Sequence, residues 1–287
     1  MFLKKLKPIH FLILTLALSA TFFSLLYFQR PDSKLHIKIY DVGQGDSIFI
    51  RTAAGYKILV DGGPDNSVLE QLAKDIPAWD HKIDFLILTH PQADHLTGLI
   101  EVVKRYQIGK LIYSGVVNNT KNYKTWEELV EEKKIDKEIV SAGEEINFPD
   151  KTEIKFLWPR EEHPIVKDLN EACVVFELNF GNFSGLFTGD ADQQVQPYSG
   201  NIGEIDFLKV PHHGSKTSLQ PTFFMRLSPT VSAISVGAKN KYGHPRAELL
   251  NLLTSIKDNK VYRTDKNGTI EVVSDGQSWY TSLERGN

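Results

Sequence analysis

Short apolar runs that end in aspartate, histidine or glycine recur along this chain from His36 onward. The first half contains HIKIYDV, DSIFIRT, YKILVDGG and FLILTH, and the second contains TEIKFLWP, ACVVFELNF, FSGLFTGD, DFLKVPHH and TVSAISVG. Runs of this length between turn-forming residues predict β-strands. Apolar periodicity in residues 93–106, 125–134 and 218–227 predicts helices. Two halves of this kind indicate an α/β fold in which two sheets pack face to face with helices outside.

The last part of the chain predicts two further elements. Residues 244–256, HPRAELLNLLTSI, predict a helix with Pro245 in its first turn. Residues 261–276, VYRTDKNGTIEVVSDG, predict a β-hairpin with Asn267 and Gly268 in its turn.

The N-terminus contains a long apolar segment. Residues 11–28 are apolar or small and uncharged, and Lys4, Lys5 and Lys7 precede them. A membrane-spanning helix needs roughly 20 such residues, and positive charge before it favours a cytoplasmic N-terminus. We therefore expect an uncleaved membrane anchor. The alternative is a signal peptide that is cut near the small residues ALSA, which would release a secreted domain.

Charge and cysteine content exclude several classes of protein. The formal net charge of −3 gives no global positive field that would attract nucleic acid, so a polyanion would be held locally, by a metal or by lysines such as Lys216 and Lys239. The single cysteine, Cys173, excludes an internal disulfide or a cysteine-rich zinc site, and its apolar surroundings predict a core position. We find no Ser-His-Asp arrangement and no phosphate-binding glycine loop of comparable coherence.

Histidines and aspartates cluster where the apolar runs end. Five of the nine histidines fall in only three loops, THPQADHLTGL, VPHHGS and YGHP. Strand ends are places where a rigid scaffold presents functional groups, and imidazole and carboxylate together bind divalent metals. Each loop alone is also typical of a turn or a helix cap, but their joint occurrence predicts a metal site. The side chains at these strand ends are His90, Asp94, His95, His212, His213 and His244, with Asp61 in LVDGG and Asp190 in LFTGD.

The order of the motifs resembles a known family. DVGQGDS, LVDGG, THPQADHLTGL, LNEACVVFEL, LFTGD, VPHHGS and YGHP follow one another as in the metallo-β-lactamase superfamily. More narrowly, the chain is similar to the exported hydrolase-like domain of ComEC-type competence proteins, from about Ile37 to Val273. The resemblance implies an αββα sandwich with a metal site at the sheet edges, here preceded by one N-terminal membrane helix.

The resemblance also implies a division of the chain and a location. Residues 1–30 would be the membrane anchor or signal segment, residues 31–36 a linker, and residues 37–287 the hydrolase domain. The protein would then be a single-pass protein of the cell membrane with its catalytic domain outside the cytoplasm. The competence proteins carry a channel of several membrane helices, and this chain has room for one, so we do not expect it to form a DNA-uptake channel by itself.

Individual residues take roles from the family pattern. His90, Asp94 and His95 match its H-x-H-x-D-H stretch, Asp190 resembles the bridging aspartate, and Asp61 resembles the residue that orients the ligand loop. Asn170 is the nearest match to the next metal-binding histidine. His244 matches a late histidine that binds metal or shapes the pocket. The implied metal ligands are His90, Asp94, His95, Asp190, His212, Asn170 and His244, and the residues expected to act in catalysis are Asp94 and His213.

One departure from the family pattern affects the choice of metal. Gln92 stands where the family has a middle histidine, and with Asn170 it makes one metal pocket rich in oxygen. Such a pocket should bind zinc less tightly and should tolerate manganese or magnesium better. We therefore expect one or two divalent ions, zinc or manganese.

The leading hypothesis is a metal-dependent phosphodiesterase or nuclease that acts on DNA or another extracytoplasmic phosphodiester. The predicted partners are this substrate and, through the N-terminal helix, the membrane; no protein partner can be inferred. A lactonase, a β-lactamase and a phosphorylcholine esterase of the cell wall are alternatives on the same fold. A DNA-binding module without catalysis, serving competence, is an alternative of another class, and a metal-free structural relic is a third possibility.

Overall fold

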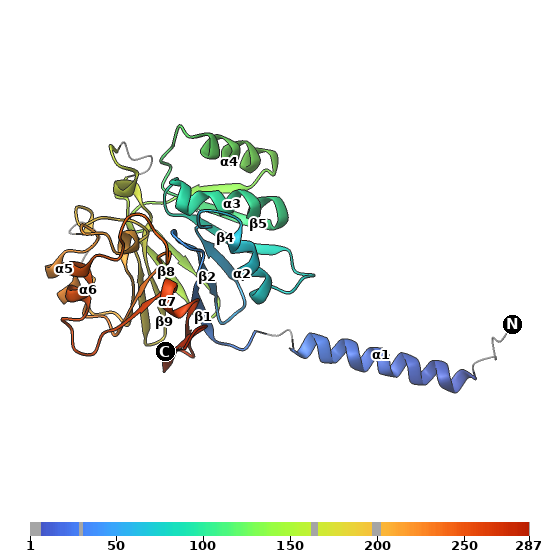
Figure 1. The fold of residues 1–287 in the computed structure, drawn as a ribbon. Coiled ribbons are helices and arrows are strands. Elements are labelled where there is room, and N and C mark those ends of the chain that lie inside the picture. Colours follow the sequence, from blue (N-terminus) through green and yellow to red (C-terminus); the bar gives the residue numbers. More distant parts are fainter. Residues whose placement is uncertain (1–6, 29–30, 162–165, 197–201, 287) are drawn as a thin grey trace.

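Two β-sheets pack face to face in this protein, and helices cover the outer face of each (Figure 1). The computed structural model describes residues 7–28, 31–161, 166–196 and 202–286, without the side chains of residues 22–28. The αββα sandwich predicted from the sequence is therefore confirmed.

The first sheet has eight strands in the order β15-β14-β1-β2-β3-β4-β5-β6. From β15 to β3 neighbouring strands are antiparallel, and from β3 to β6 they are parallel. Its strands are β1 (Leu35–Ile39), β2 (Ile48–Arg51), β3 (Lys57–Val60), β4 (Lys82–Leu88), β5 (Gln107–Tyr113), β6 (Asp136–Ile139), β14 (Ile270–Ser274) and β15 (Trp279–Leu283).

The second sheet has seven strands in the order β13-β12-β11-β10-β9-β8-β7. The strands from β7 to β10 are antiparallel, and those from β10 to β13 are parallel. Its strands are β7 (Glu145–Asn147), β8 (Glu153–Trp158), β9 (Val175–Phe180), β10 (Phe183–Phe187), β11 (Phe207–Lys209), β12 (Val231–Ile234) and β13 (Lys260–Arg263).

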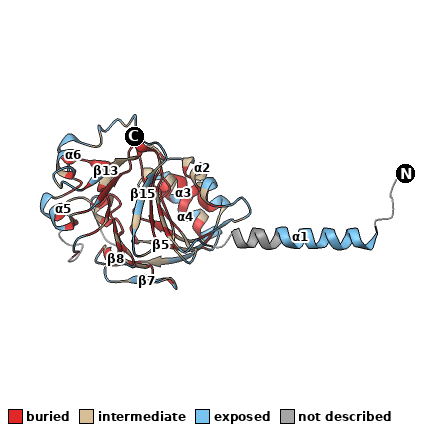
Figure 2. Cartoon of the chain, turned by 90° about the horizontal axis from the view of Figure 1, so that it is seen from below, coloured by how far each residue is buried: buried red, intermediate tan, exposed pale blue. Residues whose placement is uncertain are grey.

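Helices lie on the outer face of each sheet, and apolar side chains form three packed layers. One layer lies between the sheets, a second between the first sheet and its helices, and a third between the second sheet and α5 and α6 (Figure 2). The helices are α2 (Ser67–Asp75), α3 (Ala93–Arg105) and α4 (Lys121–Glu132) on the first sheet, α5 (Pro221–Leu227) and α6 (Ala247–Leu253) on the second, and the short α7 (Thr264–Asn267), η1 (Leu169–Ala172) and η3 (Pro211–Gly214).

Sequence patterns account for these layers. In β1 buried and partly exposed residues alternate, as in an antiparallel strand with one face in the core. All residues of β11 and β12 are buried, because these parallel strands are covered by the other sheet on one face and by helices on the other. Cys173 is fully buried, which confirms its predicted core position.

The prediction for the C-terminal region is wrong in two respects. Residues 261–276 do not form a hairpin, because β13 belongs to the second sheet and β14 to the first, and α7 carries the chain between them. The hairpin partner of β14 is β15. The helix α6 begins at Ala247, so Pro245 precedes it instead of lying in its first turn.

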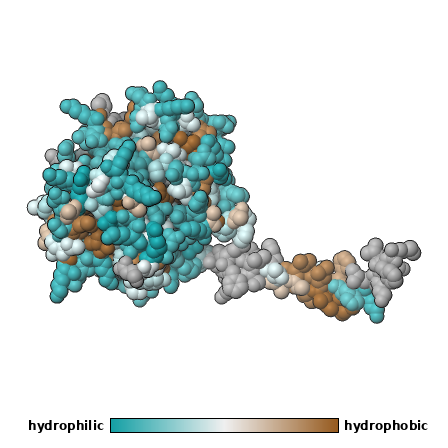
Figure 3. All heavy atoms as spheres, viewed as in Figure 1, coloured by the Kyte–Doolittle hydropathy of each residue, from teal (hydrophilic) through white to brown (hydrophobic). Residues whose placement is uncertain are grey.

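The N-terminal segment forms the helix α1 (Pro8–Phe28), which extends away from the sandwich (Figure 1). Its apolar side chains, such as Phe11 and Leu16, are exposed, and Figure 3 shows hydrophobic side chains gathered there. None of the helices within the described residues combines the length and the hydropathy needed to cross a membrane. The structure therefore supports a helix but not the predicted membrane span, and residues 1–6 and 29–30 of that prediction lie outside the described part.

Candidate metal centre

The polar loops meet at one edge of the sandwich because each follows the carboxyl end of a strand. Asp61 directly follows β3, His90 lies two residues beyond β4, and Asp190 lies three residues beyond β10. His212 and His213 lie in η3, just after β11. Since β3 and β4 are parallel neighbours, as are β10 and β11, their carboxyl ends lie side by side.

Close backbone packing places the start of α3 against the loop after β3. A Cβ atom at Gly98 would lie 1.9 Å from the carbonyl oxygen of Gly62, and one at Gly45 would lie 2.2 Å from that of Asp94. Only glycine fits these two positions. The backbone N–H of Gly62 donates to the carbonyl of His95, at 2.7 Å. The first turn of α3, which carries Asp94 and His95, is therefore held rigidly by the loop beneath it.

Left-handed backbone conformations occur at three of the site residues. Asp61, His212 and His213 have φ angles of 56°, 46° and 51°. Non-glycine residues rarely adopt such angles, and strained backbone of this kind concentrates at functional sites. The tight turn in η3 directs the two adjacent histidines to different neighbours.

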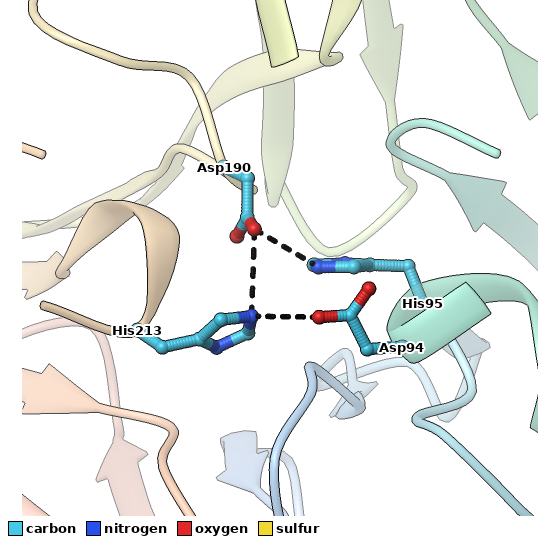
Figure 4. Close-up of side chains that lie close together, drawn as sticks. All are labelled: Asp94, His95, Asp190 and His213. Carbon is cyan, nitrogen blue, oxygen red and sulfur yellow. Dashed lines mark ion pairs between the residues drawn. The ribbon is translucent and has the colours of Figure 1, made fainter. Parts of the chain in front are cut away.

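Four side chains converge to form the candidate metal centre (Figure 4). Oδ2 of Asp190 lies 3.4 Å from Nε2 of His95 and 3.4 Å from Nε2 of His213. Nε2 of His213 also lies 3.4 Å from Oδ2 of Asp94. One ligand atom from each of the four residues lies within 4.8 Å of the others.

Several buried atoms of this cluster have no hydrogen bond among the described residues and could bind a divalent cation. Both carboxylate oxygens of Asp190 and the Nε2 atoms of His95 and His213 are buried, and none has a hydrogen-bond partner among the described residues. Buried polar groups are nearly always satisfied, so several unsatisfied atoms facing one point indicate a missing ligand. Two imidazoles and two carboxylates are a donor set that suits zinc or manganese.

Hydrogen bonds on the far side of each imidazole fix its orientation. Nδ1 of His95 donates to Oδ2 of Asp61 at 2.8 Å, and Thr89 donates to the same carboxylate through its backbone and its hydroxyl group. Nδ1 of His213 donates to the carbonyl of Ser235 at 3.0 Å. Such outer contacts leave Nε2 free as the ligand atom, which is how proteins commonly hold metal-binding histidines. Asp61 thus occupies the orienting position that the sequence predicts.

A buried ion pair behind His213 was not anticipated from the sequence. Nζ of Lys209 donates to Oδ2 of Asp46 at 2.5 Å, and both side chains are almost completely buried. Oδ1 of the same aspartate lies 3.5 Å from Nδ1 of His213. Two signals could have revealed the pair: a lysine inside the apolar run DFLKV directly before the histidines, and the aspartate that follows two glycines in DVGQGDS.

The second predicted pocket is less complete. Nε2 of His90 is buried and has no hydrogen-bond partner within the described chain, and the His90 and His95 ring centroids are 4.2 Å apart. The amide of Gln92 donates to Oδ1 of Asn170 at 2.8 Å, so this predicted ligand oxygen is already engaged. Nε2 of His212 lies 3.9 Å from Oδ2 of Asp190. His90, Asn170 and His212 thus border the site without joining the four-residue cluster.

His244 lies at the rim of the site. Its ring centroid is 6.0 Å from that of His212, and its Nδ1 atom is buried without a hydrogen-bond partner in the part described. The ring of Tyr242 stacks on that of His244, with 5.7 Å between the centroids. A metal-binding role for His244 stays a prediction, and its position suits shaping the entrance.

The charges of the site raise the pKa values of the central histidines. Burial favours their neutral form, but the facing carboxylates outweigh it, and Asp190 holds the pKa of His213 at about 10. Asp190 and Asp61 likewise hold the pKa of His95 well above its ordinary value. Burial and the neighbouring His95 lower the pKa of His90 to about 3. The metal-free cluster therefore takes up protons where a cation would bind.

Metal binding is expected to release protons and to weaken in acid. A histidine must be neutral to bind a metal, and the raised pKa values of His95 and His213 mean that both are protonated at pH 7 without one. We expect about two protons to be released per ion at pH 7, and the affinity to rise with pH towards the pKa of about 10 of His213. Calorimetry in buffers of different ionisation enthalpy measures this number. Binding without proton release would contradict the assignment of these ligands.

Comparison with known proteins agrees with this fold. The family model described as "Metallo-beta-lactamase superfamily" matches residues 40–238. ComE operon protein 3 of Bacillus subtilis is 31% identical over 271 residues, which cover 87% of this chain and 34% of that protein. Recombination protein 2 of Haemophilus influenzae is 29% identical, over 86% of this chain and 30% of its own. Competence protein ComA of Neisseria gonorrhoeae is 28% identical, over 84% of this chain and 32% of its own. The chain thus spans about a third of the length of these curated relatives.

Solved structures share the fold at low sequence identity. The metallo-β-lactamase fold protein YhfI from Bacillus subtilis matches with a TM-score of 0.51 and 15% identity, over 81% of this chain and 98% of its own. CmlA, a diiron β-hydroxylase from Streptomyces venezuelae, matches with a TM-score of 0.51 and 18% identity, over 80% of this chain and 52% of its own. With the two sheets, the clustered ligands and the family match over most of the sandwich, the chain belongs to the metallo-β-lactamase superfamily and resembles the hydrolase domain of the ComEC-type competence proteins.

Proposed function

We propose that this domain is a metal-dependent phosphodiesterase that cleaves DNA or a chemically similar phosphodiester. The observation that carries the proposal is the buried cluster of Asp94, His95, Asp190 and His213, whose ligand atoms face one another without hydrogen bonds among the described residues. When bound there, a divalent ion would lower the pKa of water and neutralise charge on the reacting phosphate. The family contains metal-dependent hydrolases, and the finer assignment to phosphodiesters is ours.

We assign some residues of the site to binding the ion and another to transferring a proton. His95, Asp190 and His213 would hold the ion with Asp94, since their free atoms all point inward (Figure 4). His213 was expected to act in catalysis, but its Nε2 lies 3.4 Å from both Asp94 and Asp190. Nε2 of the more exposed His212 lies farther away, 3.9 Å from Asp190, so we assign the proton to His212. Nδ1 of His212 lies 3.2 Å from Oδ1 of Asp192, which stabilises the protonated ring.

His212 is suited to donate a proton to the leaving oxygen. Burial lowers its pKa, but the hydrogen bond with Asp192 and the charge of Asp190 outweigh this and leave the pKa above the ordinary value. Its side chain is 27% exposed, whereas that of His213 is 2% exposed, so His212 can reach a substrate at the mouth of the site. A raised pKa favours the protonated ring, which is the form that general acid catalysis requires.

Two observations favour a phosphodiester over a lactone, a β-lactam or a phosphorylcholine ester. Gln92 and Asn170 place amides, not imidazoles, beside the cluster, so the oxygen ligands there are the carboxylates of Asp94 and Asp190, which manganese or magnesium accepts. The relatives are named for competence and recombination, which are processes of DNA. A non-catalytic role in binding DNA is the alternative of another class, and the location outside the cytoplasm at a membrane stays a prediction.

A substrate panel tests the proposal. The full chain, loaded with Mn²⁺ or Zn²⁺, would be assayed on bis(p-nitrophenyl) phosphate, p-nitrophenyl phosphorylcholine, a γ-lactone and nitrocefin. We expect kcat/KM on the phosphodiester without a choline group to exceed that on the lactone and the β-lactam by at least tenfold, and EDTA to abolish it. A preference for the phosphorylcholine ester would identify the esterase alternative, and turnover of the lactone or β-lactam alone would contradict the proposal.

A further inference from the structure

The loop between β12 and α6 is a positively charged segment in a chain of net negative charge. Residues 237–246 contain Lys239, Lys241 and Arg246 and no acidic residue, whereas the whole chain has a formal net charge of −3. All three side chains belong to exposed residues. Lys239 forms no ion pair with any residue that the structure describes. Its charge is thus available to a ligand.

This loop borders a hollow that reaches the metal centre. The hollow has a volume of about 390 Å³, and its lining includes Lys239, Lys241 and Tyr242 together with Asp94. Asp94 is one of the four residues of the candidate metal centre. A ligand in the hollow therefore lies beside both the cationic loop and the cluster that would cleave it.

Hydrogen bonds hold the loop in a fixed shape. The side chain of Asn240 donates to the carbonyls of Gly237 and His244, both at 2.8 Å, and accepts from the backbone N–H of His244 at 2.9 Å. The backbone N–H of Gly237 donates to the side chain of Gln44, which lines the hollow. Hydrogen bonds thus hold the loop internally and against the loop that precedes β2. Little conformational entropy is therefore lost when a ligand binds.

Tyr242 presents an aromatic face at the end of this loop. Its residue is 50% exposed, which is unusual for a large aromatic group, and one face of the ring stacks on His244 with an angle of 25° between the planes. Nζ of the exposed Lys241 lies over the ring, 5.5 Å from its centroid. An exposed ring that stacks on a second ring, with a mobile cation close to it, is a combination that proteins use to bind a nucleobase and its phosphates.

We propose that the loop of residues 237–246 is a binding site for single-stranded nucleic acid that leads the chain to the metal centre. Tyr242 stacks on an unpaired base, and Lys239 and Lys241 bind the phosphates that flank it. The proposal rests on the phosphodiesterase activity proposed above and narrows its substrate to a polymer. A small phosphodiester would leave the tyrosine and the lysines without partners.

Binding without catalysis provides the first test. Full-length protein in EDTA, where no hydrolysis occurs, would be titrated into fluorescein-labelled dT₁₂, rU₁₂ and a 12-base-pair duplex and followed by anisotropy. We expect both single strands to bind more tightly than the duplex, and Tyr242→Ala to weaken their binding by about tenfold or more, since stacking on one aromatic ring has this effect. Tyr242→Phe should retain wild-type binding. Equal binding by wild type and Tyr242→Ala, or tighter binding of the duplex, would overturn the proposal.

The lysines are tested by the dependence of binding on salt. Lys239→Ala combined with Lys241→Ala removes two proposed phosphate contacts, and each contact on a single strand contributes roughly 0.7 to the slope of log K against log salt. We expect the slope to fall by roughly 1.4 in this double variant. The matched controls are Lys133→Ala with Lys257→Ala, and Tyr280→Ala for the aromatic ring, because these exposed side chains lie on other parts of the surface. An unchanged slope in the loop variant would contradict the assignment.

Hydrolysis separates this proposal from the one on which it rests. The ratio of kcat/KM on dT₁₂ to that on bis(p-nitrophenyl) phosphate is expected to fall at least tenfold in Tyr242→Ala, because only the oligonucleotide has a base to stack. An unchanged ratio in an active enzyme would overturn the binding site while the phosphodiesterase stands. A wild-type protein that binds dT₁₂ through the loop but cleaves neither substrate would refute the phosphodiesterase and leave the binding site in place.

Discussion

Replacement of Asp190 with alanine is expected to abolish metal-stimulated hydrolysis of a phosphodiester while the chain stays folded. Oδ2 of Asp190 lies 3.4 Å from the ligand atoms of both His95 and His213, so this carboxylate occupies the centre of the cluster. Its loss removes the group that neutralises the ion and sets its position. We expect kcat/KM to fall on the order of 10³-fold or more.

The fold should tolerate this change because the Asp190 carboxylate faces the ring nitrogens of His95 and His213, and these rings can become neutral when it is lost. The backbone N–H of residue 190 donates to the sulfur of Cys173 at 3.3 Å, and that contact is retained. Circular dichroism and thermal unfolding in EDTA would check that the variant is folded, and Asp258→Ala, at an exposed aspartate, is the matched control. Asp190→Asn tests the charge without a change of shape. A rate equal to that of the wild type in either Asp190 variant would contradict the site.

Lys209→Met is expected to destabilise the protein strongly. Lys209 and Asp46 are 0% and 1% exposed, and among the described residues Nζ of Lys209 makes the closest cationic contact to the buried carboxylate, ahead of His213 at 3.5 Å. Removing Lys209 leaves the buried carboxylate without its closest partner, which costs about 3–5 kcal/mol in the free energy of unfolding. In a chain of this size the melting temperature should fall by roughly 10 °C. Lys257→Met, at an exposed lysine, should leave it nearly unchanged.

The double variant Asp46→Asn with Lys209→Met distinguishes a charge effect from a packing effect. Replacing both charges removes the unpaired carboxylate, so part of the lost stability should return, and the two substitutions should be non-additive by more than about 1 kcal/mol. Thermal and urea unfolding of the four proteins measure this coupling. If the losses in free energy of unfolding are additive, the two side chains are not energetically coupled. Because Asp46 also lies 3.5 Å from Nδ1 of His213, the single variant Asp46→Asn should lose hydrolysis as well.

The sequence allowed the layers and the centre of the site to be predicted because both follow from local patterns. The apolar runs became strands, the periodicity of residues 93–106 became α3, and the motifs around His95 and Asp190 came together as parallel strand ends must. The hairpin at Asn267 was predicted wrongly because asparagine followed by glycine indicates a turn but not which strands it joins. Here the turn ends a short helix between two sheets, which depends on long-range pairing.

Other features depended on contacts that a single sequence does not reveal. Lys209 and Asp46 are 163 residues apart, so their pairing follows only from the packing of the two sheets. The hydrogen bond between Gln92 and Asn170 joins residues 78 apart and changes how these amides are interpreted, because the Gln92 amide N–H engages the Asn170 oxygen. The different roles of His212 and His213 follow from their left-handed backbone, which the sequence alone does not indicate.

Metal occupancy measured together with hydrolysis tests the central claim most directly. The full chain, stripped with EDTA, would be dialysed against increasing concentrations of Mn²⁺ or Zn²⁺; bound metal would be counted by mass spectrometry, and hydrolysis of bis(p-nitrophenyl) phosphate would be assayed on the same samples. We predict that at least one ion binds per chain and that hydrolysis rises in proportion to occupancy of the cluster of Asp94, His95, Asp190 and His213. A chain that binds no ion, or that hydrolyses the ester equally well without one, would contradict it.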